Sequence, residues 1–318
     1  MDKKFVVIGG GTGSFTVLKG LKKYTDQISA VVNMFDSGGS TGKLRDEFGI
    51  LPPGDVRRCL VALSADEDGT MRKLFDFRFG QNGSLNGHSF GNLLLTALTQ
   101  ITGSEVEAIK ESAHILNIKG TVLPVTIDNS NLCAVLENGQ IIKGETNIDI
   151  PKHDTKNHIE SIFLEPEAYV FSEVVDAILQ ADVIVIGPGD LYTSVIPNLL
   201  VNGVPEAIKQ SKAKKIYVCN LMTKNGETDG FKASDFVKEI EKYLKTNLDF
   251  VICNSKIGSK DLLEKYSKEK AFPVLVDAEN LKKFRLVSKN LITEPELIRH
   301  DSSKLADEII KIAEEKYD

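Results

Sequence analysis

Long apolar runs and clusters of basic residues are both missing from this 318-residue sequence. No stretch approaches the ~20 apolar residues that a membrane-spanning helix needs, so we expect no membrane insertion. The net charge is −6, with no basic arm or arginine-rich stripe, so we expect no nucleic-acid partner. The N-terminus runs into an expected strand and is not typical of a signal peptide. These absences, with an apolar content of 42%, indicate a globular cytoplasmic protein.

Cysteine and histidine are scarce and scattered. The four cysteines, Cys59, Cys133, Cys219 and Cys253, have no CxxC spacing, and the five histidines form no HxxxH pair or His/Cys cluster. A structural zinc site needs such groups of ligands, so we expect none. The cysteines are expected to be reduced thiols in the core of a cytoplasmic protein.

The first forty residues alternate between apolar runs and glycine turns. Residues 5–8 and 28–35 are apolar runs of strand length, and residues 15–23 between them have a helical pattern. Glycine-rich turns follow the runs at residues 9–14 and 36–42. This order predicts a βαβ unit with both turns at one sheet edge. Glycine permits close approach to a ligand and a helix N-terminus attracts phosphate, so we expect a nucleotide there.

The same rhythm returns later in the chain. Apolar runs at residues 183–186, 216–219 and 250–253 each end in a polar or glycine turn. Between the two halves, residues 121–164 have strand-like patterns and an Asn138-Gly139 hairpin signal. We predict one domain, residues 1–318, with a Rossmann-like α/β fold. It contains a doubly wound, mostly parallel sheet and a small β-rich insertion at about residues 121–164.

Two stretches of the sequence resemble phosphate-binding motifs but do not match them fully. Residues 9–14 place Ser14 where GxGxxG needs its third glycine, while Asp36 stands where a dinucleotide fold keeps its ribose-binding acid. A dehydrogenase therefore stays open on this stretch alone. Residues 37–44 imitate a P-loop, but Ser37 replaces the first glycine and Leu44 replaces the Mg²⁺-binding Ser/Thr, which excludes a P-loop NTPase. The backbone N–H groups of both turns still suit an anion.

Residues 87–91 match G-x-S-x-G, the nucleophile elbow of hydrolases. That motif works only when a strand delivers the serine into the turn, and the residues before Gly87 are polar and glycine-rich. We therefore expect His88 and Ser89 to face a ligand as donors at a helix N-terminus, with Asn92 one turn further on. Plain capping of that helix is the alternative.

Two further stretches supply candidates for phosphate binding. Residues 187–194 lie between a buried run and a helical pattern, as the first glycine turn does. Asp190 within them is interpreted as a helix cap, a sugar-hydroxyl acceptor or a metal ligand. Asp55 is expected to cap the helix over residues 56–65, where Arg57 or Arg58 could hold a phosphate through two hydrogen bonds.

Together these stretches resemble the YvcK/CofD family, and more closely its YvcK, or gluconeogenesis factor, branch. The resemblance is carried by residues 9–14 (GGGTGS), 36–45 (DSGGSTGKLR), 51–63 (LPPGDVRRCLVAL), 87–92 (GHSFGN), 187–200 (GPGDLYTSVIPNLL) and 219–228 (CNLMTKNGET). It implies a Rossmann-like fold with a nucleotide or nucleotide-sugar site along the C-terminal edge of the strands.

For YvcK-like members the implied ligand is UDP-N-acetylglucosamine. The implied role is regulatory, in cell-envelope synthesis and cell shape on gluconeogenic carbon, and such binding requires no cofactor. We expect the ligand to be held by glycine turns, polar side chains and one arginine: Gly10, Gly11, Thr12, Gly13, Asp36, Ser37, Arg57, His88, Asn92, Gly187, Gly189, Asp190, Ser194, Asn220 and Thr223.

For CofD-like members the resemblance implies a transferase that moves a phospholactyl group from a guanosine diphosphate donor with Mg²⁺. Asp36 and Asp55 would then position Mg²⁺ or deprotonate the acceptor, with Asp36 as the candidate metal ligand. Ser37 stands where the family pattern has a second aspartate, and Asp190 where the YvcK loop more often has serine. The loss of a carboxylate weakens the transferase alternative. The sequence leaves a homodimer and the identity of any protein partner open.

Overall fold

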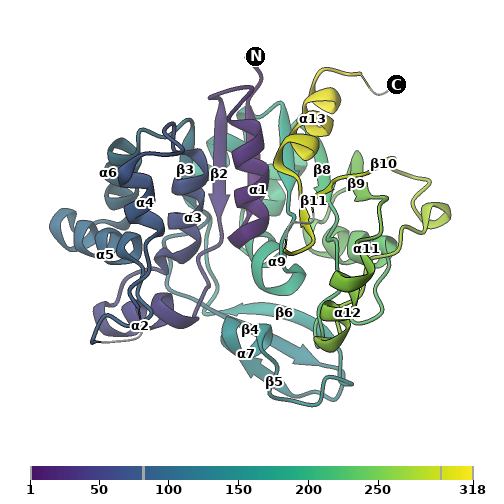
Figure 1. Ribbon diagram of the computed structural model, residues 1–318, viewed down its shortest axis with the longest axis horizontal. Coiled ribbons are helices and arrows are strands. Elements are labelled where there is room, and N and C mark those ends of the chain that lie inside the picture. The colour runs from purple at the N-terminus through teal and green to yellow at the C-terminus, as the bar shows by residue number, and fades with distance from the viewer. Residues whose placement is uncertain (1, 81–82, 294–295, 317–318) are drawn as a thin grey trace.

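A seven-stranded sheet in the order β10-β9-β8-β7-β1-β2-β3 forms the centre of the computed structural model, which describes residues 2–80, 83–293 and 296–316 (Figure 1). Its neighbouring strands pair in parallel. The strands are β1 Phe5–Gly9, β2 Ile28–Val32, β3 Thr121–Pro124, β7 Val183–Ile186, β8 Lys214–Val218, β9 Phe250–Asn254 and β10 Arg285–Lys289. The Rossmann-like α/β fold predicted from the sequence is confirmed.

Helices cover both faces of this sheet. Helices α1, α3 and α13 lie together on one face (Figure 1). Helix α10 packs against both α8 and α11 in a second layer. The helices are α1 Gly11–Leu21, α2 Gly39–Phe48, α3 Pro53–Leu63, α4 Thr70–Asp76, α5 Phe90–Thr102, α6 Glu105–Leu116, α7 Glu145–Asp149, α8 Ser172–Gln180, α9 Ile196–Leu199, α10 Val204–Gln210, α11 Ala233–Leu244, α12 Lys260–Lys268 and α13 Ser302–Ala313. A π-helical turn η1 Leu191–Val195 and a 3₁₀ turn η2 Ala278–Asn280 complete the set.

A small antiparallel sheet lies beyond the C-terminal ends of the main strands (Figure 1). It contains β4 Asn131–Leu136, β5 Ile141–Lys143 and β6 Ile159–Glu165, with α7 beside it. The expected start of this insertion at residue 121 needs correction, because β3 pairs in parallel with β2. Val122 and Leu123 are buried there, and β3 contacts α3 and α6. A further pair, β11 Ile292–Thr293 and β12 Arg299–His300, is antiparallel.

The direction of strand order reverses between β1 and β7. From β1 the chain builds outward to β2 and β3, and it later returns to β7 on the other side and builds outward to β10. Loops that follow β1 and β7 therefore lead in opposite directions and leave a crevice between them. Ligands in open α/β sheets bind at this kind of switch point, outside the carboxyl ends of the strands.

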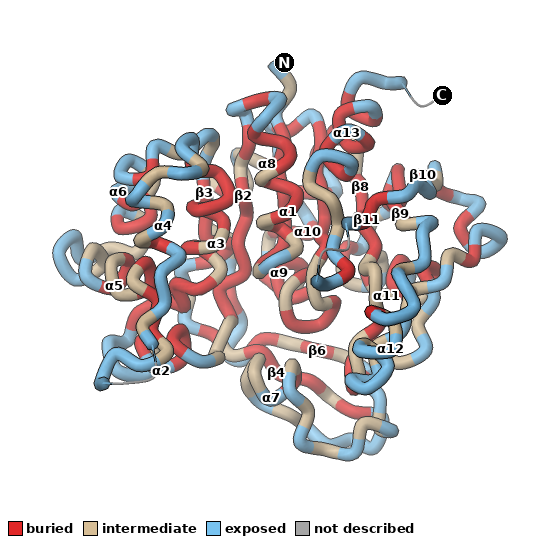
Figure 2. Tube along the Cα trace, viewed as in Figure 1, coloured by how far each residue is buried: buried red, intermediate tan, exposed pale blue. Residues whose placement is uncertain are grey.

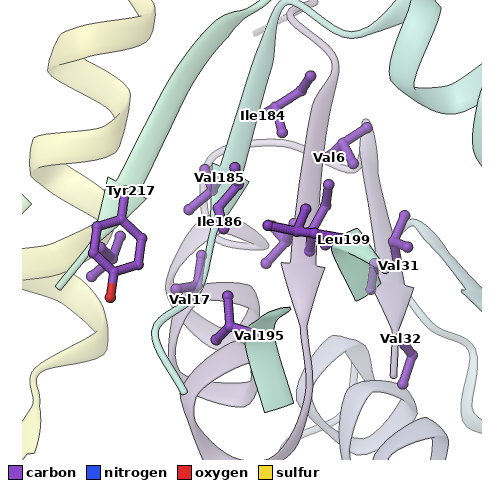
Figure 3. Close-up of a cluster of buried hydrophobic side chains, with 14 of the residues drawn as sticks. Val6, Val17, Val31, Val32, Ile184, Val185, Ile186, Val195, Leu199 and Tyr217 are labelled. Atoms are coloured by element: carbon purple, nitrogen blue, oxygen red, sulfur yellow. The ribbon is translucent and has the colours of Figure 1, made fainter. Parts of the chain in front are cut away.

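The core lies along the central strands. Figure 2 shows buried residues following these strands and the helices against them. In the close-up of Figure 3, Val6 of β1, Val31 of β2 and Ile184 of β7 belong to one cluster of buried side chains, which also includes Val17 and Leu199. Strands buried on both faces need such near-continuous apolar runs, which is why these segments were recognisable in the sequence.

The glycine turns are themselves the first turns of helices. Helix α1 begins at Gly11, before the helical pattern predicted at residues 15–23, and α2 begins at Gly39 within the second glycine turn, where no helix was predicted. The expectation that Asp55 caps α3 is wrong: Pro52 is the N-cap residue and Asp55 lies in the first turn. Proline suits the start of a helix because its missing N–H would have no helical partner there.

The state of the cysteines and the apolar character of the helices were both predicted from the sequence. The four cysteines are free and buried, as predicted. In the described part of the chain, no helix has both the length and the apolar character needed to cross a membrane.

Candidate functional site

The main cleft opens at the switch point between β1 and β7. Its volume is about 240 Å³. The first turn of α1, the loop after β7, the start of α3 and the N-terminus of α7 all contribute to its wall. The lining residues are Gly10, Gly11, Thr12, Gly13, Asn33, Asp36, Asp55, Arg58, Glu145, Gly189, Asp190, Thr193 and Ser194. Segments from both halves of the chain and from the small sheet therefore meet in one place.

The first turn of α1 and the loop after β7 touch at this cleft. A Cβ on Gly13 would stand 2.0 Å from the carbonyl oxygen of Pro188, so only glycine permits this approach. Gly11 has a φ of +63°, a conformation that glycine adopts readily. Because the first turn of α1 lines the cleft, its N–H groups, which have no partner within the helix, are available to an anion. The N–H of Gly11 already donates to the carboxylate of Asp55.

Three carboxylates form an acidic wall: Asp36 beyond β2, Asp55 in α3 and Glu145 in α7. Burial, and then the charge of Asp36, raises the pKa of Asp55 to about 7. Burial and the same neighbouring charge raise the pKa of Glu145 to about 8. Burial also raises the pKa of Asp36, although the N–H of Gly38 donates to it at 2.8 Å. Such half-buried carboxylates of like charge are typical of functional sites.

The two adjacent arginines of α3 have different environments. Arg58 lines the cleft, and its Nη1 donates to Oγ1 of Thr12 at 2.6 Å. Arg57 is buried away from the cleft, with its Nη1 2.9 Å from Oδ1 of Asp76. Asp55 and Arg58 are three residues apart and share a helix face, whereas Arg57 lies on another face. That spacing is the sequence signal that would have favoured Arg58.

Arg57, His88 and Asn92 form a buried hydrogen-bonded cluster with Ser40. Arg57 Nε donates to Asn92 Oδ1 at 3.1 Å, and Asn92 Nδ2 donates to Ser40 Oγ at 3.3 Å. His88 Nδ1 lies 3.0 Å from Ser40 Oγ. Ser89 caps α5 by accepting from the N–H of Asn92, which agrees with the capping alternative. The cluster joins α2, α3 and α5, and none of its four members lines the main cleft.

The loop after β7 contributes most of its predicted residues. Gly189, Asp190 and Ser194 line the cleft, whereas Gly187 does not. Asp190 is the N-cap residue of η1 by position, but its side chain makes no cap hydrogen bond. Its Oδ2 lies instead 2.9 Å from Nζ of Lys224. Lys224 was not among the expected site residues, because nothing local in the sequence indicates this pairing.

Ser37, Asn220 and Thr223 lie outside the main cleft. Ser37 Oγ accepts from the N–H of Thr146 at 3.1 Å and thereby holds α7 to the loop after β2. Asn220 Nδ2 donates to the carbonyl oxygen of Gly189 at 2.8 Å, next to the cleft wall. Thr223 is buried, and its Oγ1 accepts from the N–H of Phe272 at 3.0 Å. Thr223 therefore supports a loop.

A second cleft lies on the same sheet edge, beyond β8 and β9. Its volume is about 270 Å³. Asn220, which contacts the wall of the main cleft, also lines this second one, together with Asn254 and the exposed side chains of Ile257 and Leu275. The two clefts are thus neighbours. The first offers backbone N–H groups and charges, and the second offers amides and apolar surface.

Residues that the sequence reasoning missed complete the main cleft. Asn33 Nδ2 donates to the carbonyl oxygen of Thr193 at 3.1 Å. Asn33 Oδ1 and Thr193 Oγ1 are buried and have no hydrogen-bond partner among the described residues. Buried polar atoms of this kind call for a partner such as a ligand or water. Asn33 directly follows β2 and Glu145 starts α7, so only the fold brings them to Thr193.

Mg²⁺ does not have a complete protein site here. Within residues 2–80, 83–293 and 296–316, no group of three or more His, Cys, Asp or Glu side chains could hold a metal ion. Asp36 and Asp55 nevertheless line one cleft, and the charge of Asp36 raises the pKa of Asp55, an effect that a cation between them would relieve. Mg²⁺ in nucleotide sites is usually held by one or two carboxylates plus substrate phosphates. The residues present fit such a shared site.

Comparison with known proteins gives full-length matches. The family model described as 2-phospho-L-lactate transferase CofD matches residues 5–292. A Thermotoga maritima relative is 50% identical over 317 residues, covering 98% of this chain and 99% of its own. The Bacillus subtilis protein named gluconeogenesis factor is 40% identical and covers 98% of both chains.

A solved structure agrees with the sequence relatives. The crystal structure of a member of the UPF0052 family from Bacillus halodurans matches with a TM-score of 0.91 and 45% identity. The match covers 98% of this chain and 99% of that one. With the architecture, the clefts and these matches in agreement, the chain belongs to the CofD family and resembles, over its length, the members named gluconeogenesis factor.

Proposed function

We propose that this protein binds a nucleotide sugar, with UDP-N-acetylglucosamine as the expected ligand, and acts as a regulator rather than as an enzyme. We propose that this regulation acts on cell-envelope synthesis and cell shape during gluconeogenic growth. The proposal is more specific than the name of its relatives, gluconeogenesis factor. One observation carries the binding proposal: the N-terminus of α1, the loop after β7 and Arg58 converge on one cleft at the switch point.

The diphosphate is assigned to the main cleft. Backbone N–H groups of the first turn of α1 and the guanidinium of Arg58 are the donors there. A diphosphate held by charge-assisted hydrogen bonds needs few of them, because micromolar affinity corresponds to about −8 kcal/mol. Asp36, Asp55 and Glu145 accept hydrogen bonds and therefore suit hydroxyl groups of the ribose or the sugar.

The base is assigned to the second cleft. Asn220 and Asn254 offer amide donors and acceptors for the edge of a pyrimidine, and Ile257 and Leu275 offer apolar surface for its face. Asn220 adjoins both clefts through its bond to Gly189. A nucleotide sugar has a planar base and an anionic diphosphate in series, which is the arrangement that two neighbouring clefts can accommodate.

A CofD-like transferase is the second candidate, and the acidic wall is the observation that favours it. The pKa of Asp55, raised to about 7, suits a general base at neutral pH. Mg²⁺ held between a carboxylate and the donor phosphates would supply Lewis-acid chemistry. In that case Asp36 would hold the ion, and Asp55 would accept a proton from the acceptor hydroxyl.

A ligand screen separates these proposals. Thermal unfolding of the full chain should be measured with UDP-, GDP- and ADP-sugars at millimolar concentration, with and without Mg²⁺, followed by calorimetry of each ligand that stabilises. We expect UDP-N-acetylglucosamine to stabilise the protein and to be recovered intact. The binding proposal fails if no nucleotide sugar raises the unfolding temperature. Mg²⁺-dependent consumption of a nucleoside-diphosphate donor would favour the transferase.

A further inference from the structure

Lys224 ties together three acidic side chains from three separate segments. Its Nζ lies 2.9 Å from Oδ2 of Asp190 and 2.8 Å from Oε1 of Glu227, and it also contacts Asp149 of α7. Asp190 follows β7, and Lys224 and Glu227 follow β8. One ammonium group therefore faces three carboxylates at the junction of the main sheet, the loop after β7 and the small sheet.

The environment of Glu227 keeps Lys224 in place. The side chain of Glu227 is fully buried, and its contact with Lys224 lacks hydrogen-bond geometry. Burial raises the pKa of Glu227 to about 7, against the opposing effect of Lys224. A buried carboxylate without a cation is strongly unfavourable. The ion pair with Glu227 therefore favours the observed position of Lys224 beside Asp190.

Asp190 is the member of this group that lines the main cleft. As the N-cap residue of η1 it would ordinarily accept a hydrogen bond from its own helix, but it makes none. Its carboxylate points to Lys224 instead. Without that partner, a full negative charge would be added to a wall that already carries Asp36, Asp55 and Glu145. Like charges that line one cleft repel one another even at a high effective dielectric constant.

We propose that Lys224 is a positioning residue that neutralises Asp190 and holds it away from the bound anion. The inference rests on the proposed function, since it assumes that the cleft receives a diphosphate. It adds that an anion can enter this acidic cleft because Lys224 compensates the negative charge of Asp190 in the loop after β7. Lys224 acts through Asp190 and makes no contact with the ligand.

A rescue experiment tests this role. Calorimetry should be done on the full chain with UDP-N-acetylglucosamine and with inorganic pyrophosphate. Lys224→Met is expected to weaken binding of both by about tenfold or more, as expected for an uncompensated charge. The double variant Lys224→Met/Asp190→Asn should regain most of the lost affinity, because the repelling charge is gone. Lys224→Arg should bind within a few-fold of the unaltered protein.

Lys238→Met is the matched control, since it removes the lysine of an exposed ion pair with Asp235 in α11 and leaves the pair of Lys224 with Asp190 intact. It should change affinity by no more than about threefold. If Lys224→Met does not fold, Lys224→Met/Glu227→Gln takes its place in every comparison, because it removes the buried charge as well.

The outcomes separate the two proposals. Unchanged affinity in Lys224→Met, or a folded double variant that regains none of the lost affinity, overturns the role of Lys224 alone. Failure of the unaltered chain to bind either probe overturns the proposed nucleotide-sugar site, and this inference with it.

Discussion

Arg58 and Thr12 meet at the main cleft, where Nη1 of Arg58 lies 2.6 Å from Oγ1 of Thr12. This contact places a guanidinium beside the first turn of α1, where the diphosphate is assigned. Arg57, one residue earlier, is buried and paired with Asp76. The two arginines therefore provide a matched pair of variants that separates binding from stability.

Arg58→Ala should weaken UDP-N-acetylglucosamine binding by about tenfold to a hundredfold, because a charge-assisted hydrogen bond to phosphate contributes about 1.5–3 kcal/mol. The unfolding temperature should change little. Arg57→Ala should instead lower the free energy of unfolding by about 2–3 kcal/mol, because it leaves buried acceptors unpaired. Calorimetry and chemical denaturation measure the two effects. Equal loss of affinity in folded forms of both variants would contradict the assignment.

Gly13→Ala should disrupt the contact between the first turn of α1 and the loop after β7. The new methyl group would meet the carbonyl oxygen of Pro188 at 2.0 Å, so either the helix turn or the loop must shift. We expect a loss of about 1–3 kcal/mol of stability, as for overpacking elsewhere, and weaker ligand binding. Gly80→Ala is the control, since a Cβ there meets nothing within 4 Å. Thermal unfolding and calorimetry of both variants provide the comparison, and a Gly13→Ala protein that behaves like the control would refute the contact.

Asp55 should make the ligand-free protein less stable as the pH rises. The folded state holds this proton up to a pKa of about 7, whereas the unfolded chain releases it near pH 4. The folded state therefore binds more protons across this interval, and stability falls with rising pH until about pH 7. Asp55→Asn removes this pH dependence. At pH 8 its free energy of unfolding should exceed that of the unaltered protein by about 1–2 kcal/mol, a value reduced to account for solvent in the cleft.

Urea denaturation from pH 5 to pH 8.5 measures this effect. Asp46→Asn, which removes an exposed carboxylate of α2, serves as the control and should leave the pH profile unchanged. A parallel fall in stability for Asp55→Asn and the unaltered protein would show that Asp55 is not the group responsible. Glu145, whose pKa burial raises to about 8, should act in the same direction.

Asp36→Asn decides between the regulator and the transferase. Asp36 is common to the acidic wall and to the proposed Mg²⁺ site, and its charge raises the pKa values of Asp55 and Glu145. If the protein is a transferase, the variant should lose Mg²⁺-dependent turnover by at least about a hundredfold. If it is a binder, affinity should change by only a few-fold. Turnover that survives the substitution would exclude Asp36 from the chemistry.

Much of the fold was predictable because its signals are local. Apolar runs at residues 5–8, 183–186 and 250–253 indicated buried strands, and each lies within a strand of the parallel sheet. The hairpin signal at Asn138-Gly139 lies between β4 and β5, as expected. The boundary at residue 121 was wrong because a strand in the main sheet and a strand in an insertion have the same apolar pattern. Pairing with β2 distinguishes them.

The sequence by itself determined the class of fold and predicted the sheet edge at which the proposed site lies, because glycine turns after buried strands act through backbone geometry over a few residues. Only the tertiary structure decided which side chains share the cleft. The phase of α3 selects Arg58 over Arg57, and the packing of the small sheet brings Glu145 to Asp36. Lys224 and Asp190 are 34 residues apart, and their pairing depends on two loops that follow adjacent strands.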